Sequence, residues 1–223
     1  MRRRRLSRRH GGRAGGCVLM GLTLLLAAAA CLLLQPPRAR DVAALFAFST
    51  PEAARSEVLS LPARGWYLVE SDARAVAACE TLLEAELVRE RYGPLAGVRY
   101  LETKAVDLRV TASPAQLDAL AHSAQALEDA FAALQTIAGL EAQEAAAAAE
   151  ALRTRLESVC QALDGALVGT DHPVVRGLAG LVYSAREAAR TLAENAEAGA
   201  AEEAGAALAL QYEAFTAYLL TQG

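Results

Sequence analysis

The sequence is poor in the residues that carry most enzyme chemistry. It contains three histidines, His10, His122 and His172, and no two of them have the spacing of metal ligands on one helix. No Cys-x-x-Cys pair and no glycine-rich phosphate-binding loop occurs in the sequence. His122 and Ser123 are neighbours in a helical stretch, so their side chains point in different directions and do not form a nucleophile–base pair. We therefore expect no enzymatic activity, no metal and no cofactor.

Aromatic residues and lysine are also scarce, at 5% of the chain for the aromatics and Lys104 as the only lysine. Charge is unevenly distributed, because residues 1–40 hold nine of the 22 basic groups and no acidic group. Residues 41–223 are left with 13 basic and 26 acidic groups. A strongly acidic polypeptide is repelled by nucleic acids and by anionic headgroups, so we expect no nucleic acid partner.

Residues 15–34 form one long apolar run without a charged residue. A helix of about twenty apolar residues matches the thickness of a bilayer. Residues 1–14 carry seven arginines, which predicts a cytoplasmic N-terminus and an extracytoplasmic C-terminal part. The sequence thus predicts a single-pass protein of the cell membrane. Cleavage after the alanines that end at Ala30 and lipidation of Cys31 are the two alternatives.

Residues 42–112, which follow a linker at 35–41, have the pattern of a small α/β unit. We expect a strand at 42–48 and then a helix that is capped by Thr50 and runs to about Leu61. Residues 66–69 are the second expected strand. Ser71 or Asp72 would cap a longer helix that ends at Gly93. This helix would bury Val76, Leu83 and Leu87, and the alternation over 98–110 predicts the last strand. The expected order is β-α-β-α-β, a sheet covered by two helices.

Residues 113–223 are predicted to be a helical tail. Ser113, Pro114 and Gln116 have the pattern of a capped helix start. Apolar residues then follow a three–four spacing on both sides of a turn at 169–173, which is typical of packed helices. The apolar positions of the first part are Leu117, Leu120, Ala124, Leu127, Phe131, Leu134 and Ala138, and those of the second are Leu152, Leu156, Val159, Leu163 and Leu167.

Two architectures satisfy this pattern, a long antiparallel hairpin and a four-helix bundle folded at the glycines near residues 139 and 199. We expect the hairpin, because Leu140-Glu141-Ala142 offers no new helix cap and an isolated helix glycine costs only about 1 kcal/mol. Alanine-rich stretches meet at the middle of the tail. This waist is either its weakest part or a surface on which a second copy packs to form a homodimer.

The sequence Ala44-Leu45-Phe46-Ala47-Phe48-Ser49-Thr50-Pro51-Glu52-Ala53-Ala54, followed by a helix and Gly65-Trp66-Tyr67-Leu68-Val69, resembles the opening of a SPOR (sporulation-related) domain. The strand Leu108-Arg109-Val110-Thr111-Ala112 before a long capped helix is similar to SPOR-like membrane proteins of endospore-forming bacteria. The resemblance implies that the α/β unit binds peptidoglycan glycan at division or sporulation sites. Aromatic rings are the expected contacts, and they are Phe46, Phe48, Trp66 and Tyr67. Packing in the core of the small sheet is the alternative for each of them, and Trp66, beside a turn, is the one expected to be exposed.

The alternative function is that of a scaffold, which binds another envelope protein through the helical tail.

Cys79 and Cys160 lie in the predicted extracytoplasmic part, where an oxidising compartment permits a disulfide between them. Two free, buried thiols are the alternative.

Overall fold

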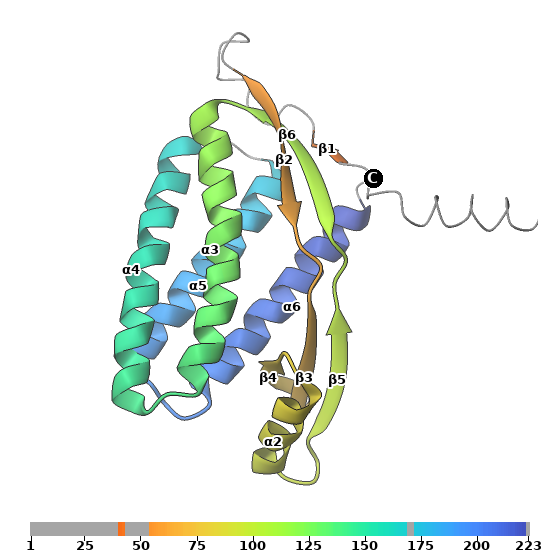
Figure 1. Ribbon diagram of the computed structural model, residues 1–223, viewed down its shortest axis with the longest axis vertical. Helices are drawn as coiled ribbons and strands as arrows, with labels where there is room; N and C mark the ends of the chain where they lie inside the picture. Colours follow the sequence, from red (N-terminus) through yellow and green to blue (C-terminus); the bar gives the residue numbers. More distant parts are fainter. Residues whose placement is uncertain (1–39, 43–53, 169–171, 222–223) are drawn as a thin grey trace, which may run out of the picture. The chain divides into compact units, whose positions relative to one another are not determined.

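The computed structural model describes residues 40–42, 54–168 and 172–221 of the chain (Figure 1). Within these residues the fold is α+β, as expected, with two small sheets and five helices. The strands are β1 (Arg40–Val42), β2 (Arg55–Leu61), β3 (Gly65–Ser71), β4 (Arg74–Cys79), β5 (Gly97–Glu102) and β6 (Val106–Ala112). The helices are α2 (Leu82–Tyr92), α3 (Pro114–Ala138), α4 (Ala142–Ala166), α5 (Pro173–Glu194) and α6 (Ala200–Thr221).

The paired strands β2–β6 and β3–β5 form one bent antiparallel ribbon. In one sheet β6 lies between β2, which is antiparallel to it, and β1, which is parallel; in the other, β3 lies between β4 and β5. Pro62–Arg64 separate β2 from β3, and Thr103–Ala105 separate β5 from β6. Thr103 holds the two bends together, because its N–H donates to the Arg64 carbonyl at 2.8 Å and its Oγ1 accepts from the Arg64 N–H at 2.9 Å. The single strand expected at 98–110 is therefore two strands.

Two helix predictions in this unit are wrong. Residues 55–61 were expected to end a helix, but they form β2, which pairs along its length with β6. The longer helix was expected to begin after Ser71 or Asp72. Instead, Asp72 (φ 51°) and Ala73 (φ 59°) form the tight turn between β3 and β4, and Val76 is buried in β4. Pairing with a neighbouring strand satisfies the backbone of these residues, and this outweighs their local helix signals.

Helix α2 begins only at Leu82, with Thr81 and Glu84 forming a capping box, and ends before Gly93 as expected. Because β2 and β4 replace helical segments, the described order before the bundle is β1-β2-β3-β4-α2-β5-β6 and differs from the expected β-α-β-α-β. The expected strand at 42–48 lies outside the described residues except for Val42, and so does the expected cap at Thr50.

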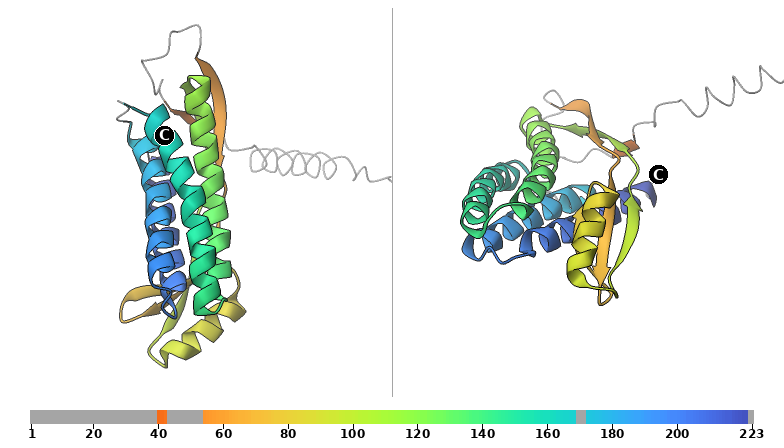
Figure 2. Two further views of the ribbon diagram at one scale, coloured as in Figure 1. Left: turned by 90° about the vertical axis from the view of Figure 1, so that its left-hand side faces the viewer. Right: turned by 60° about the horizontal axis from the view of Figure 1, so that its bottom comes forward.

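The helical tail is a four-helix bundle, so the favoured long hairpin is wrong and its alternative is correct (Figures 1 and 2). The start of α3 is confirmed, since Ser113 and Gln116 form a capping box with Pro114 in the first turn. The first arm reverses at Gly139–Glu141, although Glu141 provides no side-chain cap. The second arm reverses at Asn195–Gly199, where Gly199 has a φ of 85°.

The reversal is explained by burial of apolar surface. The seam residues Leu127 and Leu134 of α3 are 1% exposed, and so are Leu152, Leu156 and Leu163 of α4. A long hairpin would bury each helix against one partner only. Folding both arms over gives α3 three neighbours, α4, α5 and α6, and each buried leucine side chain contributes about 1.5–3 kcal/mol. This gain outweighs the poor cap at Glu141.

Strand β3, at the centre of sheet β4-β3-β5, carries buried residues on both of its faces. Trp66 and Leu68 of β3 belong to the large core that also contains α3 and α6. Val69, the residue after Leu68, belongs to a second core with β4 and α2. Because successive residues of a strand point to opposite faces, the bundle covers one face of this sheet and α2 covers part of the other.

The predicted membrane anchor at 15–34 lies outside the described residues. Among the residues that are described, none of the helices combines the length and the apolar character that a bilayer span requires.

Candidate functional site: the groove beside helix α2

Helix α2 carries apolar side chains on two faces, of which only one is covered. Ala85 and Val88 are buried in the second core, against β3 and β4. Leu82, Leu83 and Leu87 are 50%, 72% and 58% exposed. The prediction that Leu83 and Leu87 are buried is therefore wrong. Isolated exposed leucines are normal on a protein surface, but an exposed cluster on one helix indicates a surface that binds something.

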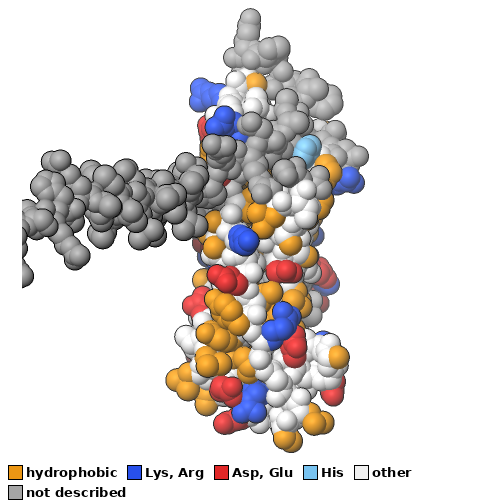
Figure 3. Space-filling model, turned by 90° about the vertical axis from the view of Figure 1, so that its right-hand side faces the viewer, with side chains coloured by type: hydrophobic (Ala, Val, Ile, Leu, Met, Phe, Trp, Pro, Cys, Tyr) orange, Lys and Arg blue, Asp and Glu red, His pale blue; other side chains and the backbone are white. Residues whose placement is uncertain are grey.

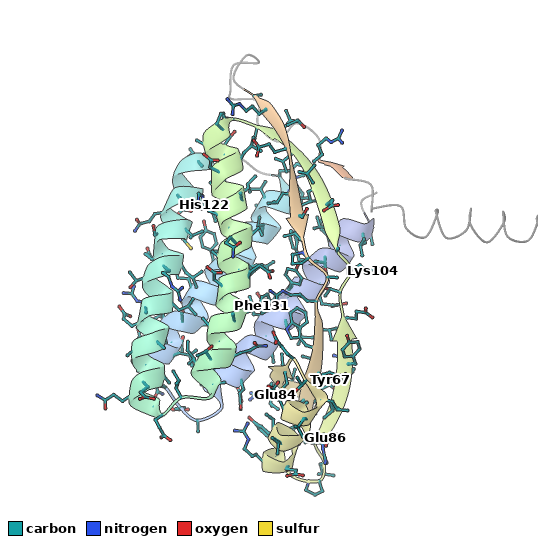
Figure 4. The ribbon with its side chains drawn as sticks, viewed as in Figure 1. Tyr67, Glu84, Glu86, Lys104, His122 and Phe131 are labelled. Carbon is teal, nitrogen blue, oxygen red and sulfur yellow. The ribbon has the colours of Figure 1, made fainter. Side chains whose placement is uncertain are left out.

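We call Leu82, Leu83 and Leu87 the α2 leucine patch. Figure 3 shows hydrophobic side chains gathered over the lower part of the molecule, where α2 and its sheet lie. Figure 4 shows that Glu84 and Glu86 belong to the same helix, at the end of the ribbon far from His122. Leu95, in the loop after α2, is 90% exposed and adds apolar surface to this end of the fold.

A groove of about 320 Å³ adjoins the patch. Its walls come from β4, α2, the C-terminal end of α3 and the N-terminal end of α6. The groove exists because its bundle wall consists mainly of small residues. Its lining residues are Ala77, Ala78, Cys79, Glu80, Glu84, Leu87, Val88, Leu134, Gln135, Ala138, Gly139, Ala201, Glu202 and Gly205. Leu87 belongs both to the patch and to the groove, so the two form one surface.

Two ion pairs fix the elements around the groove. Arg91 of α2 pairs with Oε1 of Glu202 on α6, and Arg74 of β4 pairs with Glu203 at 2.8 Å. The other oxygen of Glu202 is excluded from solvent and accepts no hydrogen bond within the described part of the chain. Leaving a buried acceptor unpaired costs about 1–3 kcal/mol, more when it is charged. Glu202 is thus an incompletely satisfied carboxylate in the groove wall.

Cys79 lines the groove without being a nucleophile. Its side chain is buried, and desolvation raises the pKa of its thiol to about 11, with Glu84 and Glu202 adding to the increase. A thiol with this pKa is protonated at neutral pH, and only the thiolate is strongly nucleophilic. The Cys79 thiol is therefore a buried part of the groove wall.

Trp66 is not the exposed platform that the sequence predicts. It is 1% exposed, and its ring packs against Phe131 of α3 at 5.2 Å and Tyr212 of α6 at 6.0 Å. Arg64 lies over the Phe131 ring at 4.6 Å and pairs with Glu128. Figure 4 places Phe131 on the side of α3 that faces the ribbon. Trp66 therefore joins the ribbon to the bundle and presents no face to a ligand in this structure.

The other predicted glycan contacts have different positions. Phe46 and Phe48 lie outside the described residues. Tyr67 is half-buried, and its ring lies 5.0 Å from that of Tyr100, directly opposite on β5. Tyr100 is 54% exposed and was missed in the sequence. The sequence did contain a signal for Tyr100, because it lies two residues after Val98 and its side chain therefore points to the same face of the strand.

Cys79 and Cys160 are free thiols, so the predicted disulfide is absent and the alternative of two buried thiols is correct. They belong to different cores, Cys79 to that of α2 and Cys160 to that of the bundle.

The two described histidines lie at different helices of the bundle. His172 caps α5, accepting a hydrogen bond from the Val174 N–H at its Nδ1, and burial lowers its pKa. His122 lines a groove between α3 and α4. No group of three metal-ligating side chains occurs within residues 40–42, 54–168 and 172–221.

No family model matches the chain, and no curated protein or solved structure is significantly similar to it. The groove, the α2 leucine patch and the tyrosine pair are the features of the described residues that bear on function.

Proposed function

We propose that this chain is a non-catalytic docking protein of the cell envelope, which binds a protein partner through the groove and the α2 leucine patch. One observation carries the proposal: three leucines of one helix are at least half exposed beside an apolar groove. Residues 15–34 would anchor the protein in the membrane, with the described fold on the outer side. This keeps the scaffold function that was the alternative from sequence, but moves its binding surface from the helical tail to α2.

The energetics of the surface support docking. Each leucine that becomes buried in a complex contributes about 1.5–3 kcal/mol, and 1.4 kcal/mol corresponds to a tenfold change in affinity. The groove is present without a partner, and the ion pair between Arg91 and Glu202 links α2 to α6 beside it. A surface that already has its binding shape loses less affinity to ordering. Hot spots of binding commonly lie in such desolvated pockets.

Site-specific photo-crosslinking in the source cells tests the proposal. A photoreactive residue would replace Leu83 or Leu87 in the full-length chain. Val168, which is 75% exposed and follows the end of α4, is the matched control position. We expect one partner protein to be crosslinked from the α2 positions and not from position 168. The purified partner should then bind the Leu83→Glu variant at least about tenfold more weakly than the wild type. Equal crosslinking from all three positions would refute the proposal.

The Tyr67–Tyr100 pair supports a second candidate function, binding of peptidoglycan glycan in the manner of SPOR domains. Sugar rings stack on exposed aromatic faces, and Tyr100 offers one on the open part of sheet β4-β3-β5. Retention of the full-length protein on purified sacculi, with and without amidase treatment, tests this function. Retention that rises on stripped glycan and is lost in Tyr100→Ala, but not in Tyr218→Ala, would support it. Equal retention of both variants would exclude the tyrosine pair as the binding site.

A further inference from the structure

We propose that the segment docked in the groove is an amphipathic helix of another protein, with basic side chains along the edge that faces Glu80, Glu84 and Glu202. This inference rests on the proposed docking function and adds the chemistry of the partner. Three features of the groove support it: the charge of its lining, the spacing of its apolar residues and the unpaired oxygen of Glu202.

The charged side chains that line the groove are all acidic. They are Glu80 after β4, Glu84 in the first turn of α2 and Glu202 in the first turn of α6, and no Lys or Arg of the described residues lines it. Three arginines lie close by, but each is already paired with a glutamate. Arg91 pairs with Glu202 and Arg74 with Glu203, while Arg64, whose charge also acts on Glu80, pairs with Glu128. A partner segment bound in the groove would therefore experience a negative electrostatic potential, which favours basic side chains on that segment.

The apolar residues of the surface have the geometry of a helix-binding site. Leu83 and Leu87 are one turn apart on α2 and form an exposed ridge, and Leu87 and Val88 continue into the groove. The opposite wall includes Ala138 and Gly139, which are at least partly exposed, whereas Leu134 and Ala201 are almost fully buried in it. An amphipathic helix binds such a surface by placing its apolar face, with residues three and four apart, between the two walls.

Glu202 provides a specific acceptor for one of the basic side chains. Arg91 engages one of its oxygens, while the other, although excluded from solvent, has no donor in the described residues. A second guanidinium or ammonium group that enters the groove would supply the missing donor after a small rotation of the carboxylate. Charge-assisted hydrogen bonds of this kind are stronger than neutral ones.

The same charges argue against two other occupants. A second copy of this chain would bring acidic residues against the acidic groove, because residues 41–223 hold 26 acidic and 13 basic groups. An anionic lipid surface would be repelled for the same reason. A basic helix of a different protein is the occupant that the lining favours.

Binding of three model peptides to the full-length chain in zwitterionic nanodiscs tests the inference. The peptides share one leucine pattern at helical spacing and carry lysine, glutamine or glutamate at the flanking positions. Fluorescence anisotropy of labelled peptides gives the affinities, and empty nanodiscs give the background. We expect the lysine peptide to bind at least about tenfold more tightly than the glutamine peptide, since each charge pair contributes up to about fivefold. The glutamate peptide should bind most weakly.

Four variants separate the possible outcomes. Glu84→Gln and Glu202→Gln should reduce the preference for lysine over glutamine, whereas Glu57→Gln, at an exposed position of β2, should not. Leu83→Glu with Leu87→Glu should abolish binding of the lysine and glutamine peptides. If the lysine and glutamine peptides bind equally and this binding needs the leucines, docking stands and the basic partner is refuted. If no peptide binds, or if the leucines do not matter, the docking function itself fails.

Discussion

The hydroxyl of Tyr212 on α6 donates a hydrogen bond of 2.8 Å to the backbone carbonyl of Pro62, in the bend between β2 and β3. The same ring meets Trp66 and Phe131 edge-on, with centroid distances of 6.0 and 5.7 Å. One residue near the C-terminal end of the chain thus fixes the bend of the ribbon to the bundle. The position of the groove depends on this junction, because β4 and α2 follow directly from β3.

Replacing Tyr212 with phenylalanine removes the hydroxyl and keeps the ring. The Pro62 carbonyl loses its donor, so we expect the free energy of unfolding to fall by about 0.5–1.5 kcal/mol. Urea unfolding followed by the fluorescence of Trp66, the sole tryptophan, measures the change. Tyr218→Phe, at a position that is 37% exposed, is the control and should alter stability little. A Tyr212→Phe variant as stable as the wild type would mean that water replaces the hydrogen bond without cost.

The same residue predicts a loss of stability at alkaline pH. Burial raises the pKa of Tyr212 to about 12 from the ordinary value near 10, and the positive charge of Arg64 only partly opposes this. The folded protein therefore retains a proton that the unfolded chain releases. The resulting stability is fully present below pH 10 and is lost as the pH rises from 10 through about 12.

Urea unfolding at several pH values between neutrality and 12 tests this dependence. Tyr212→Phe should lose less stability across the alkaline range than the wild type, and Tyr218→Phe should follow the wild type. Tyr183, whose pKa is also raised to about 12, contributes a loss of the same sign in all three proteins. If the free energy of unfolding fell equally with pH in the wild type and in Tyr212→Phe, the prediction would be wrong.

Local signals in the sequence were sufficient where an element is fixed by its own residues. Ser113, Pro114 and Gln116 predict the start of α3, and the structure has the same cap. Gly93 correctly predicts the end of α2. Both boundaries are set locally. Ser113 and Gln116 hydrogen-bond to each other three positions apart, and Gly93 has a φ of 88°, which favours glycine.

Long-range contacts decided the positions where sequence reasoning failed. Ser71 and Asp72 have the composition of a helix cap, but Asp72 lies in a turn because β4 pairs with β3. Gly139 interrupts a helical pattern without a cap, yet the chain reverses there because the four helices bury one another. Neither outcome can be computed from neighbouring residues, since it depends on segments far away in the chain.

The candidate site was hidden from the sequence for a related reason. Leu83 and Leu87 have the spacing of a buried helix face, and a pattern of apolar residues does not distinguish a covered face from an uncovered one. The prediction for Trp66 was wrong in the opposite direction, because Trp66 was expected to be exposed and is buried. Its position beside a turn suggested exposure, whereas Phe131 and Tyr212, from distant helices, enclose it.

The two described cysteines should be unreactive in the folded protein. Cys160 is fully buried and Cys79 is 9% exposed, and burial raises the pKa of both thiols. In a chain whose Cys17 and Cys31 are replaced by serine, we expect a thiol reagent to label neither cysteine before unfolding and both afterwards. Mass spectrometry of a non-reduced digest should contain no peptide pair that joins Cys79 to Cys160. Such a pair would contradict the separate cores.

Two glycines of α5 should respond in opposite ways to the same substitution. A methyl group at Gly177 would lie 2.6 Å from Cδ2 of Phe215 on α6, which is closer than carbon atoms approach, whereas in the described structure nothing lies within 4 Å of such a methyl at Gly180. Alanine is preferred to glycine within a helix by about 0.5–1 kcal/mol, so Gly180→Ala should raise the free energy of unfolding by about that amount.

At Gly177 the overlap with Phe215 outweighs the helix preference, because overpacking a core costs about 1–3 kcal/mol. Gly177→Ala should therefore lower stability, although both substitutions add one methyl group to the same helix. Thermal unfolding of the two variants beside the wild type measures the difference. If Gly177→Ala were as stable as Gly180→Ala, the ring of Phe215 could move aside, and the close approach of α5 and α6 at this point would not be required by the packing.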